Sequence, residues 1–153
     1  ARDIHIYNNT HYVRKGLDVA VLCEGRTPLN TLFENNIFYF AGTGRWGKNA
    51  KGINTRFRNN VYVNIRPHPA DPDPVTADPR LVSPGAANTR IDMKTKEALR
   101  GYLLGAGSRC RGAGRIIPDN GGRDLLGTPL PPGRPLPARK SGPRAPRGGC
   151  RYR

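Results

Sequence analysis

Three short stretches of the chain share one pattern of hydrophobic and polar residues. Residues 6–13, 33–40 and 57–64 each place an Asn–Asn pair between residues that favour β-structure. The second stretch begins 27 residues after the first, and the third begins 24 residues after the second. A β-rich pattern repeated at such an interval is typical of a solenoid, in which successive turns of the chain stack on one another.

Each stretch is predicted to form a strand, a tight turn at the Asn pair and a second strand. Side chains at equivalent positions would then stack in columns, because successive side chains of a strand point to opposite faces. We expect two interior columns, formed by Ile6, Phe33 and Phe57, and by Thr10, Ile37 and Val61. On the outer surface we expect a stack of the rings of His11, Phe38 and Tyr62.

The first Asn of each pair is expected to form a ladder of side-chain amides. Asn tolerates the left-handed backbone that a sharp turn needs. At the spacing of about 4.8 Å between strands, the amides of Asn8, Asn35 and Asn59 can hydrogen-bond from turn to turn. An alternative is that three Asn-rich hairpins belong to an antiparallel sandwich. The even spacing without paired hairpin turns favours the solenoid.

The composition excludes several classes of protein. The 19 Gly and 15 Pro residues are too many helix breakers for a helical bundle or a coiled coil. No stretch approaches the roughly 18 apolar residues that a membrane-spanning helix needs. Cys23, Cys110 and Cys150 lie far apart and show no zinc-ligand spacing. A Cys23–Cys110 disulfide is conceivable in an oxidising compartment, although free thiols are the commoner outcome for such cysteines.

The positive charge is concentrated near the end of the chain. The formal net charge is +15, but residues 129–153 carry seven Lys or Arg residues and no acid. The preceding residues carry 19 basic and 11 acidic groups, so this part is only moderately basic. The terminal stretch has too few apolar side chains to offset the entropy of ordering it. Nucleic-acid binding therefore ranks last among the functions that the charge suggests.

The repeats resemble the right-handed parallel β-helices of the pectate-lyase-like superfamily, in which each coil has three strands and an Asn ladder. The resemblance extends to residues 77–82, 102–104, 107–110, 112–114 and 119–127, which are similar to the closing segment of many secreted bacterial β-helix proteins. It implies an all-β, right-handed parallel β-helix of about three coils, the minimum for a stable solenoid. The implied strands are residues 4–7, 29–34 and 53–58, then 10–13, 37–40 and 61–64, with a further first strand at 18–24.

The resemblance also divides the chain into three parts. We expect β-helix coils over residues 1–65, a proline-rich loop and closing segment over 66–132, and a disordered basic tail over 133–153. One short helix over 94–100, ended by Gly101, would cap the end of the stack. Relatives usually continue with an acidic Gly–Ala segment where this tail begins, so a genuine tail and a shifted reading frame both fit. We expect the whole to be the C-terminal part of a longer protein.

The function implied by the resemblance concerns carbohydrates. It implies a secreted, extracytoplasmic protein of bacterial type, a lyase or glycosidase acting on an acidic polysaccharide, monomeric at full length. The alternative is a non-catalytic β-helix, an adhesin or a glycan-binding surface protein. The sequence identifies no cofactor, although the resemblance allows Ca²⁺, and it leaves open whether the protein is an enzyme. We expect no turnover from these 153 residues alone.

The resemblance places bound sugar along the first-strand face and the loop that enters it. The substrate-binding candidates are Arg14, Lys15, Asp18, Glu24, Arg26, Arg45, Trp46 and Lys48. Trp46 could stack on a sugar ring while Arg45 and Lys48 reach for carboxylates, or it could fold down as a lid on the coil edge. Asp18 and Glu24 stand up to roughly 20 Å apart on one extended strand, which is too far for a glycosidase pair. No catalytic residue is therefore assigned.

Other polar residues are expected to be structural. Asp71, Asp73 and Asp78 superficially suggest Ca²⁺, but the prolines between them favour a solvated loop. Glu34 and Arg58 occupy equivalent places on adjacent coils and should form an ion pair of small energetic weight. No group of residues has the spacing of a metal site.

Overall fold

The computed structural model describes residues 1–21, 27–48, 52–86, 97–124 and 126–129. The chain divides into two compact units, Ala1–Gly114 and Arg115–Arg153. The predicted tail over 133–153 lies outside the described residues, as do Cys23 and Cys150. Cys110 carries a free thiol.

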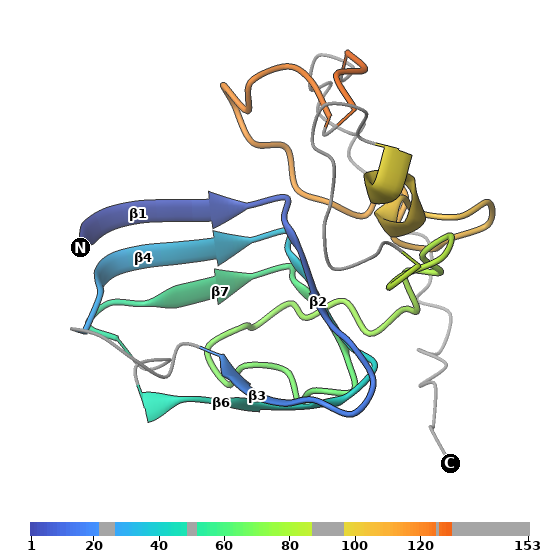
Figure 1. Cartoon of the computed structure of the whole chain (residues 1–153). Coiled ribbons are helices and arrows are strands. Elements are labelled where there is room, and N and C mark those ends of the chain that lie inside the picture. Colours follow the sequence, from blue (N-terminus) through green and yellow to red (C-terminus); the bar gives the residue numbers. More distant parts are fainter. Residues whose placement is uncertain (22–26, 49–51, 87–96, 125, 130–153) are drawn as a thin grey trace, which may run out of the picture. The chain divides into compact units, whose positions relative to one another are not determined.

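The regular secondary structure described in the first unit consists of short parallel strands and one 3-10 helix (Figure 1). In chain order the strands are β1 (Arg2–Tyr7), β2 (Thr10–Val13), β3 (Asp18–Val21), β4 (Leu29–Glu34), β5 (Ile37–Phe40), β6 (Thr43–Trp46), β7 (Arg56–Arg58) and β8 (Val61–Val63). They form three sheets with the orders β1-β4-β7, β2-β5-β8 and β3-β6. We call β1 to β3 the first rung, β4 to β6 the second rung, and β7 with β8 the third rung.

The register confirms that the three Asn–Asn stretches lie over one another. In the first sheet Ile6 pairs with Phe33, which pairs with Phe57. In the second sheet Thr10 pairs with Ile37, which in turn is the partner of Val61. Every pairing between these strands is parallel, so the antiparallel sandwich of hairpins is wrong.

The interior face of the second sheet differs from the prediction. Phe38 is 0% exposed and Tyr62 is 8% exposed, whereas Thr10, which was expected inside, is exposed. The first Asn of each pair has a left-handed backbone, with φ of 55° or 56°, and this turn resets which residues face inward. His11 therefore stacks on a buried ring, with 4.8 Å between its centroid and that of Phe38. The expected stack of His11, Phe38 and Tyr62 is thus present, but its expected place on the surface is wrong, because Phe38 and Tyr62 lie in the core.

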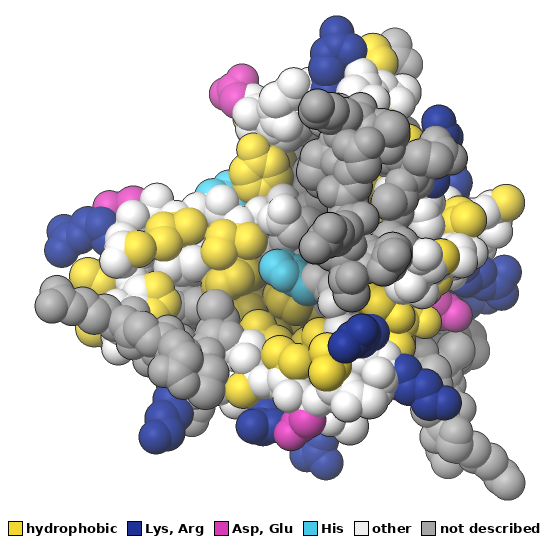
Figure 2. Space-filling model, in the orientation of Figure 1, with side chains coloured by type: hydrophobic (Ala, Val, Ile, Leu, Met, Phe, Trp, Pro, Cys, Tyr) yellow, Lys and Arg dark blue, Asp and Glu magenta, His cyan; other side chains and the backbone are white. Residues whose placement is uncertain are grey.

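Aromatic rings fill the core between the sheets. The buried cluster consists of Phe33, Phe38, Phe40, Phe57, Tyr62 and Ile65. Because the strands are in register, like rings lie over one another: Phe33 and Phe57 are parallel to within 7°, and Phe38 and Tyr62 to within 6°. Figure 2 shows hydrophobic side chains gathered in the hollow between β1, β4 and β7 on one side and β3 and β6 on the other.

The segment after β8 first pairs with the third rung and then folds back on itself. Val75 forms a parallel bridge with Val61, and Leu81 forms an antiparallel bridge with Leu104. The predicted helix is a 3-10 helix, η2 (Glu97–Tyr102), and it runs past Gly101 instead of ending there. Gly101 is required for a close approach of two backbones, since a Cβ at this position would lie 2.4 Å from the carbonyl oxygen of Ser83.

Candidate functional site

The predicted sugar-binding face corresponds to β3 and β6, which run side by side along the lower edge of Figure 1. Asp18 pairs with Thr43, and Ala20 pairs with Arg45. Val19 and Val21 pack against the core, so the residues that alternate with them point outward. This outward surface therefore carries Asp18, Thr43 and Arg45, and we call these three residues the β3/β6 polar row.

Direct hydrogen bonds link the three side chains of the polar row. Arg45 Nη1 donates to Asp18 Oδ2 over 2.5 Å, and Thr43 Oγ1 donates to Asp18 Oδ1 over 3.1 Å. The hydrogen bond from Arg45, and then that from Thr43, hold the pKa of Asp18 below its usual range. Both members of the ion pair are more than 60% exposed, at 62% and 61%, so the pair contributes little to stability. Its effect is to present an ionised carboxylate and an oriented guanidinium to solvent.

Trp46 faces the opposite way from Arg45. Its indole meets the rings of Phe38, Phe57, Tyr62 and His68 edge to face, with centroids between 4.9 and 6.1 Å apart. Its Nε1 donates a hydrogen bond of 2.9 Å to the carbonyl oxygen of Arg66. The geometry is that of an inward-folded ring that closes the core. The structure thus does not bring Trp46 and Arg45 together on one surface.

Glycines in β6 and before it explain how this tryptophan is buried. A Cβ on Gly44 would lie 2.3 Å from ring atoms of Phe40, so the glycine leaves room for that ring. A Cβ on Gly42 would lie 2.2 Å from the carbonyl oxygen of Leu17, so the two connections can approach closely. The glycine-rich sequence therefore serves the packing of β6 and favours the second of the two predicted positions of Trp46, folded down on the edge of the coil.

The remaining predicted residues flank the polar row. Arg14 and Lys15 are exposed in the connection that enters β3, and Lys48 is exposed just after β6. Glu24 and Arg26 lie outside the described residues. Among the described residues, the face therefore offers cations before β3 and after β6, on either side of the carboxylate of Asp18.

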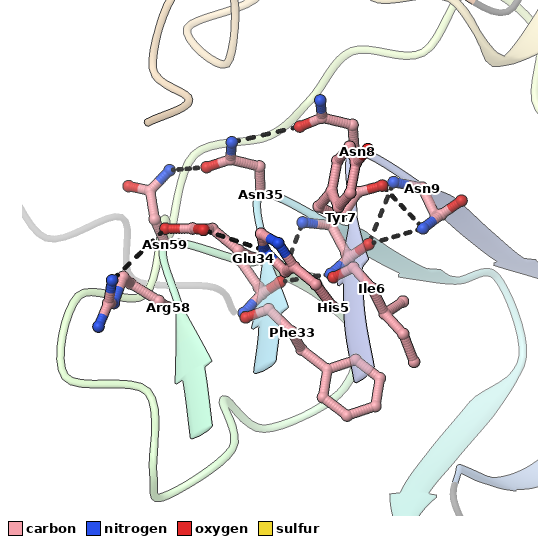
Figure 3. Close-up of polar contacts among 12 residues, drawn as sticks. His5, Ile6, Tyr7, Asn8, Asn9, Phe33, Glu34, Asn35, Arg58 and Asn59 are labelled. Carbon is pink, nitrogen blue, oxygen red and sulfur yellow. Dashed lines mark hydrogen bonds and ion pairs between the residues drawn. The ribbon is translucent and has the colours of Figure 1, made fainter. Parts of the chain in front are cut away.

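A second polar cluster lies on the outer face of β1, β4 and β7 (Figure 3). Glu34 is 6% exposed and faces two basic groups. His5 Nε2 lies 3.1 Å from one of its carboxylate oxygens, and Arg58 Nη1 lies 3.8 Å from the other. The predicted pairing of Glu34 with Arg58 is thus present, and His5 is an additional partner that sequence reasoning missed.

The predicted ladder of first asparagines is present in the structure. Asn59 Nδ2 donates to Asn35 Oδ1 over 3.0 Å, and Asn35 Nδ2 donates to Asn8 Oδ1 over 3.2 Å. We call these residues the outer ladder; Figure 3 shows it running across the three rungs. Besides the ladders of the first and second asparagines there is a third ladder, which was not predicted. It joins Asn54 to Asn30 and Asn30 to Asp3, and each hydrogen bond measures 2.8 Å.

The second asparagines form an inner ladder that is more deeply buried. Asn36 and Asn60 are 0% exposed. The side-chain oxygen of Asn60 accepts from the backbone and the amide of Asn36, at 2.9 and 3.0 Å. Asn36 in turn accepts from the backbone and amide of Asn9, at 3.1 and 3.2 Å. The Asn–Asn pairs indicated these positions, but a ladder was predicted only for the first residue of each pair.

Asp71 ends the inner ladder. Its carboxylate accepts hydrogen bonds from the backbone N–H groups of Asn59, Asn60 and Asp73, from Asn60 Nδ2 and from the hydroxyl of Tyr62. Burial and this carboxylate raise the pKa of Tyr62. Asp71 is 6% exposed, so the expectation of a solvated loop is wrong at this residue, although Asp73 and Asp78 are exposed.

The described residues include neither a metal-binding group of side chains nor a membrane-spanning helix. They contain no group of three or more His, Cys, Asp or Glu side chains that could hold a metal ion. No helix among them is long and apolar enough to cross a membrane. No protein-family model, curated protein or solved structure matches the chain.

Proposed function

We propose that the chain is a right-handed parallel β-helix from a secreted protein, and that the outward face of β3 and β6 binds an anionic polysaccharide. The repeat interval of 24 to 27 residues and the parallel, in-register strands support a solenoid. The resemblance of the repeats to the pectate-lyase-like superfamily supports carbohydrate as the ligand class, because carbohydrate polymers are what many proteins of this architecture act on.

The β3/β6 polar row is the observation that carries the proposal. A uronate presents a carboxylate and several hydroxyl groups along a repeating chain. Arg45 can donate to the carboxylate, while Asp18 and Thr43 offer an acceptor and a hydroxyl to the sugar. Arg14, Lys15 and Lys48 are exposed beyond the two ends of the row and can attract further carboxylates of the polymer.

Binding is favoured over cleavage on this face. A general acid must hold a proton at the working pH, whereas the hydrogen bonds from Arg45 and Thr43 lower the pKa of Asp18 and keep it ionised. In the described part of the chain, no second carboxylate belongs to the polar row. The proposed role is therefore that of a non-catalytic glycan-binding β-helix.

A polysaccharide lyase or glycosidase activity of a longer protein is the second candidate. The arrangement that favours it is His5 with its Nε2 against the buried carboxylate of Glu34, because a carboxylate partner orients a histidine for proton transfer. Incubation with uronate polymers tests it. A rise in ultraviolet absorbance from unsaturated ends supports the activity of a lyase.

Affinity electrophoresis in gels that contain polygalacturonate, alginate or a neutral glucan tests the binding proposal. We expect retardation by the two acidic polymers and none by the glucan. Replacing Arg45 and Lys48 together by Ala should weaken binding to acidic polymer by about tenfold, as expected for the loss of two charge-assisted contacts. The matched control replaces two exposed arginines elsewhere, Arg56 and Arg109, and removes the same charge. An equal loss in both variants would show that net charge alone is responsible.

A further inference from the structure

The two ends of the Asn ladders differ in how their hydrogen-bonding groups are satisfied. At the third rung, the carboxylate of Asp71 accepts from the N–H groups of Asn59 and Asn60, and the backbone N–H of Val75 donates to the carbonyl oxygen of Asn60. At the first rung, Asn8 Nδ2 and Asn9 Oδ1 have no partner among the residues that the structure describes. In Figure 3 both atoms point away from the second rung.

The direction of the hydrogen bonds shows what these two atoms lack. In the outer ladder each amide donates to the oxygen of the preceding rung, so Asn8 has a donor left over. In the inner ladder each asparagine accepts from the preceding rung, so Asn9 has an acceptor left over. A partner that satisfies both must present an oxygen above Asn8 and an N–H group above Asn9. The side chains of another Asn–Asn corner in the same orientation supply both.

The strands and side chains of the first rung are open in the same direction. Within the described sheets, β1, β2 and β3 each have a neighbouring strand on one side only. Ile6 and Val13 are half-buried, whereas their counterparts on the second rung, Phe33 and Phe40, are 3% and 1% exposed. On this side of the first rung, and among the residues that the structure describes, the strands thus lack a hydrogen-bonded neighbour, the core residues are only half-buried, and the ladder ends have unpaired side-chain atoms.

We propose that the first rung is a docking surface for a β-segment that runs parallel to β1 and β2 and carries an Asn–Asn corner. The first asparagine of that segment accepts from Asn8 Nδ2, and the second donates its backbone and side-chain N–H groups to Asn9 Oδ1. An apolar or aromatic residue three positions before the corner's second asparagine covers Ile6, as Phe33 does one rung below. The docking surface consists of the free edges of β1 and β2, Ile6 and the ladder ends, and it uses no side chain of the β3/β6 polar row. The inference therefore does not rest on the proposed glycan binding.

A second copy of the chain does not fit this surface. A head-to-tail neighbour would present its third rung, where Asp71 and Val75 already occupy the place of the next corner. A head-to-head neighbour would bring its strands antiparallel to β1 and β2, which does not reproduce the ladder. The partner is therefore a segment of the same kind as the rungs themselves.

The third ladder adds a requirement at the beginning of that segment. Asp3 stands at its free end and has no side-chain N–H to donate upward. The segment must therefore carry a donor above Asp3. Residues 53–66 of this chain have a suitable sequence, because Asn54 lies in the column of Asp3 and Asn30, and the Asn59–Asn60 corner lies in the columns of Asn8 and Asn9.

Fluorescence anisotropy with a labelled synthetic peptide of residues 53–66 tests the proposal on the full chain. We expect saturable binding, weakened about tenfold or more when both corner asparagines of the peptide are replaced by Ala. In the chain, Asn8→Asp keeps the oxygen that accepts from Asn35 and removes the free donor, and we expect about fivefold weaker binding. Asp3 shows that a carboxylate is accommodated at the free end of a ladder.

A second variant controls for the negative charge that Asn8→Asp adds. The peptide is basic, so the added negative charge of Asn8→Asp would by itself tighten binding. Thr76→Asp adds the same charge at an exposed residue outside the first rung and should leave the affinity unchanged or slightly higher. Equal binding of the native and Ala-substituted peptides, or no loss with Asn8→Asp, would overturn the proposal.

The direction of the bound segment can be measured independently. A nitroxide at the N-terminus of the peptide should broaden the amide NMR signals at the start of β1 (Arg2 and Asp3), and one at the C-terminus should broaden those at the end of β2 (Val13). The reverse pattern would mean antiparallel docking and would also contradict the proposal. Dimerisation of the chain without peptide, seen by sedimentation, would show that a second copy occupies the surface instead.

Discussion

Asn35 and Asn36 are neighbours with the same side chain, but they have different roles. Asn35 is half-buried, adopts a left-handed φ of 56° and makes ladder bonds on the outer surface. Asn36 is 0% exposed, and its amide donates to Ile6 and Asn60 while its oxygen accepts twice from Asn9. One asparagine makes the turn possible, and the other satisfies buried backbone groups. Arg45 and Trp46 show the same contrast between an outward and an inward neighbour.

The largest effect is expected at the end of the inner ladder. Asp71→Ala leaves five donors without their acceptor, most of them buried, and should lower the free energy of unfolding by about 3 kcal/mol or more. Asp73→Ala removes an exposed carboxylate two residues later and should change the free energy of unfolding by about 0.5 kcal/mol at most. Urea denaturation followed by circular dichroism measures both. Similar losses of stability in the two variants would mean that the burial of Asp71 does not contribute to the free energy of unfolding.

Replacing the two neighbours in β6 tests the inward and outward assignment directly. Trp46→Ala removes a ring that contacts four others and should cost about 3 kcal/mol of stability. Arg45→Ala removes an exposed ion pair and should cost less than about 1 kcal/mol. Thermal unfolding of the two variants separates these values. A Trp46→Ala variant of native stability that no longer binds acidic polysaccharide would instead place this ring in the sugar site.

The two asparagines can be compared in the same way. Asn36→Ala loses the buried amide and should destabilise the protein by about 2 kcal/mol. Asn35→Gly keeps the left-handed turn accessible and removes the outer ladder bonds, so about 1 kcal/mol is expected. Chemical denaturation measures both costs, and the comparison requires that the free energy of unfolding of the two variants depends on denaturant with the same slope. Equal costs would show that the two ladders contribute alike.

The smallest effect concerns pH. Burial lowers the pKa of His11 below its ordinary value of 6.5, so the unfolded chain binds the proton more readily. The stability that neutral His11 contributes is present above pH 6.5 and is lost as the pH falls below it. His11→Phe cannot titrate and preserves the ring stack on Phe38. Its melting temperature should therefore fall less than that of the native chain between pH 7 and pH 5; an identical fall would contradict this origin.

The sequence allowed the pairing of the strands to be predicted, but not every residue that faces the core. Three Asn–Asn pairs at regular intervals mark equivalent positions, and parallel stacking follows from their flanking residues. The inward face of the second sheet was mispredicted because strict alternation was carried through a left-handed residue, such as Asn35, that interrupts it. The boundary and type of η2 also differed, since six residues are enough for a 3-10 turn and offer little helical periodicity.

The sequence predicted where the candidate site lies, but not how its side chains are oriented. The exposed cations around β3 and β6 followed from the strand assignment, whereas the inward turn of Trp46 depends on the space that Gly44 leaves for Phe40. Asp71 was missed because most of its partners come from residues 9 to 12 positions earlier, through a loop whose path the prolines alone do not specify. Long-range contacts of single residues of this kind leave no periodic signal.

The inward position of Trp46 gives the protein a built-in optical probe. The chain contains one Trp, so all of its indole emission comes from a ring placed between tyrosine, phenylalanine and histidine side chains. Excitation absorbed by Tyr62 can pass to the indole only while the two rings stay close. Opening of the interior can therefore be followed on unlabelled protein, as a loss of tyrosine-sensitised emission together with a shift of the spectrum to longer wavelengths.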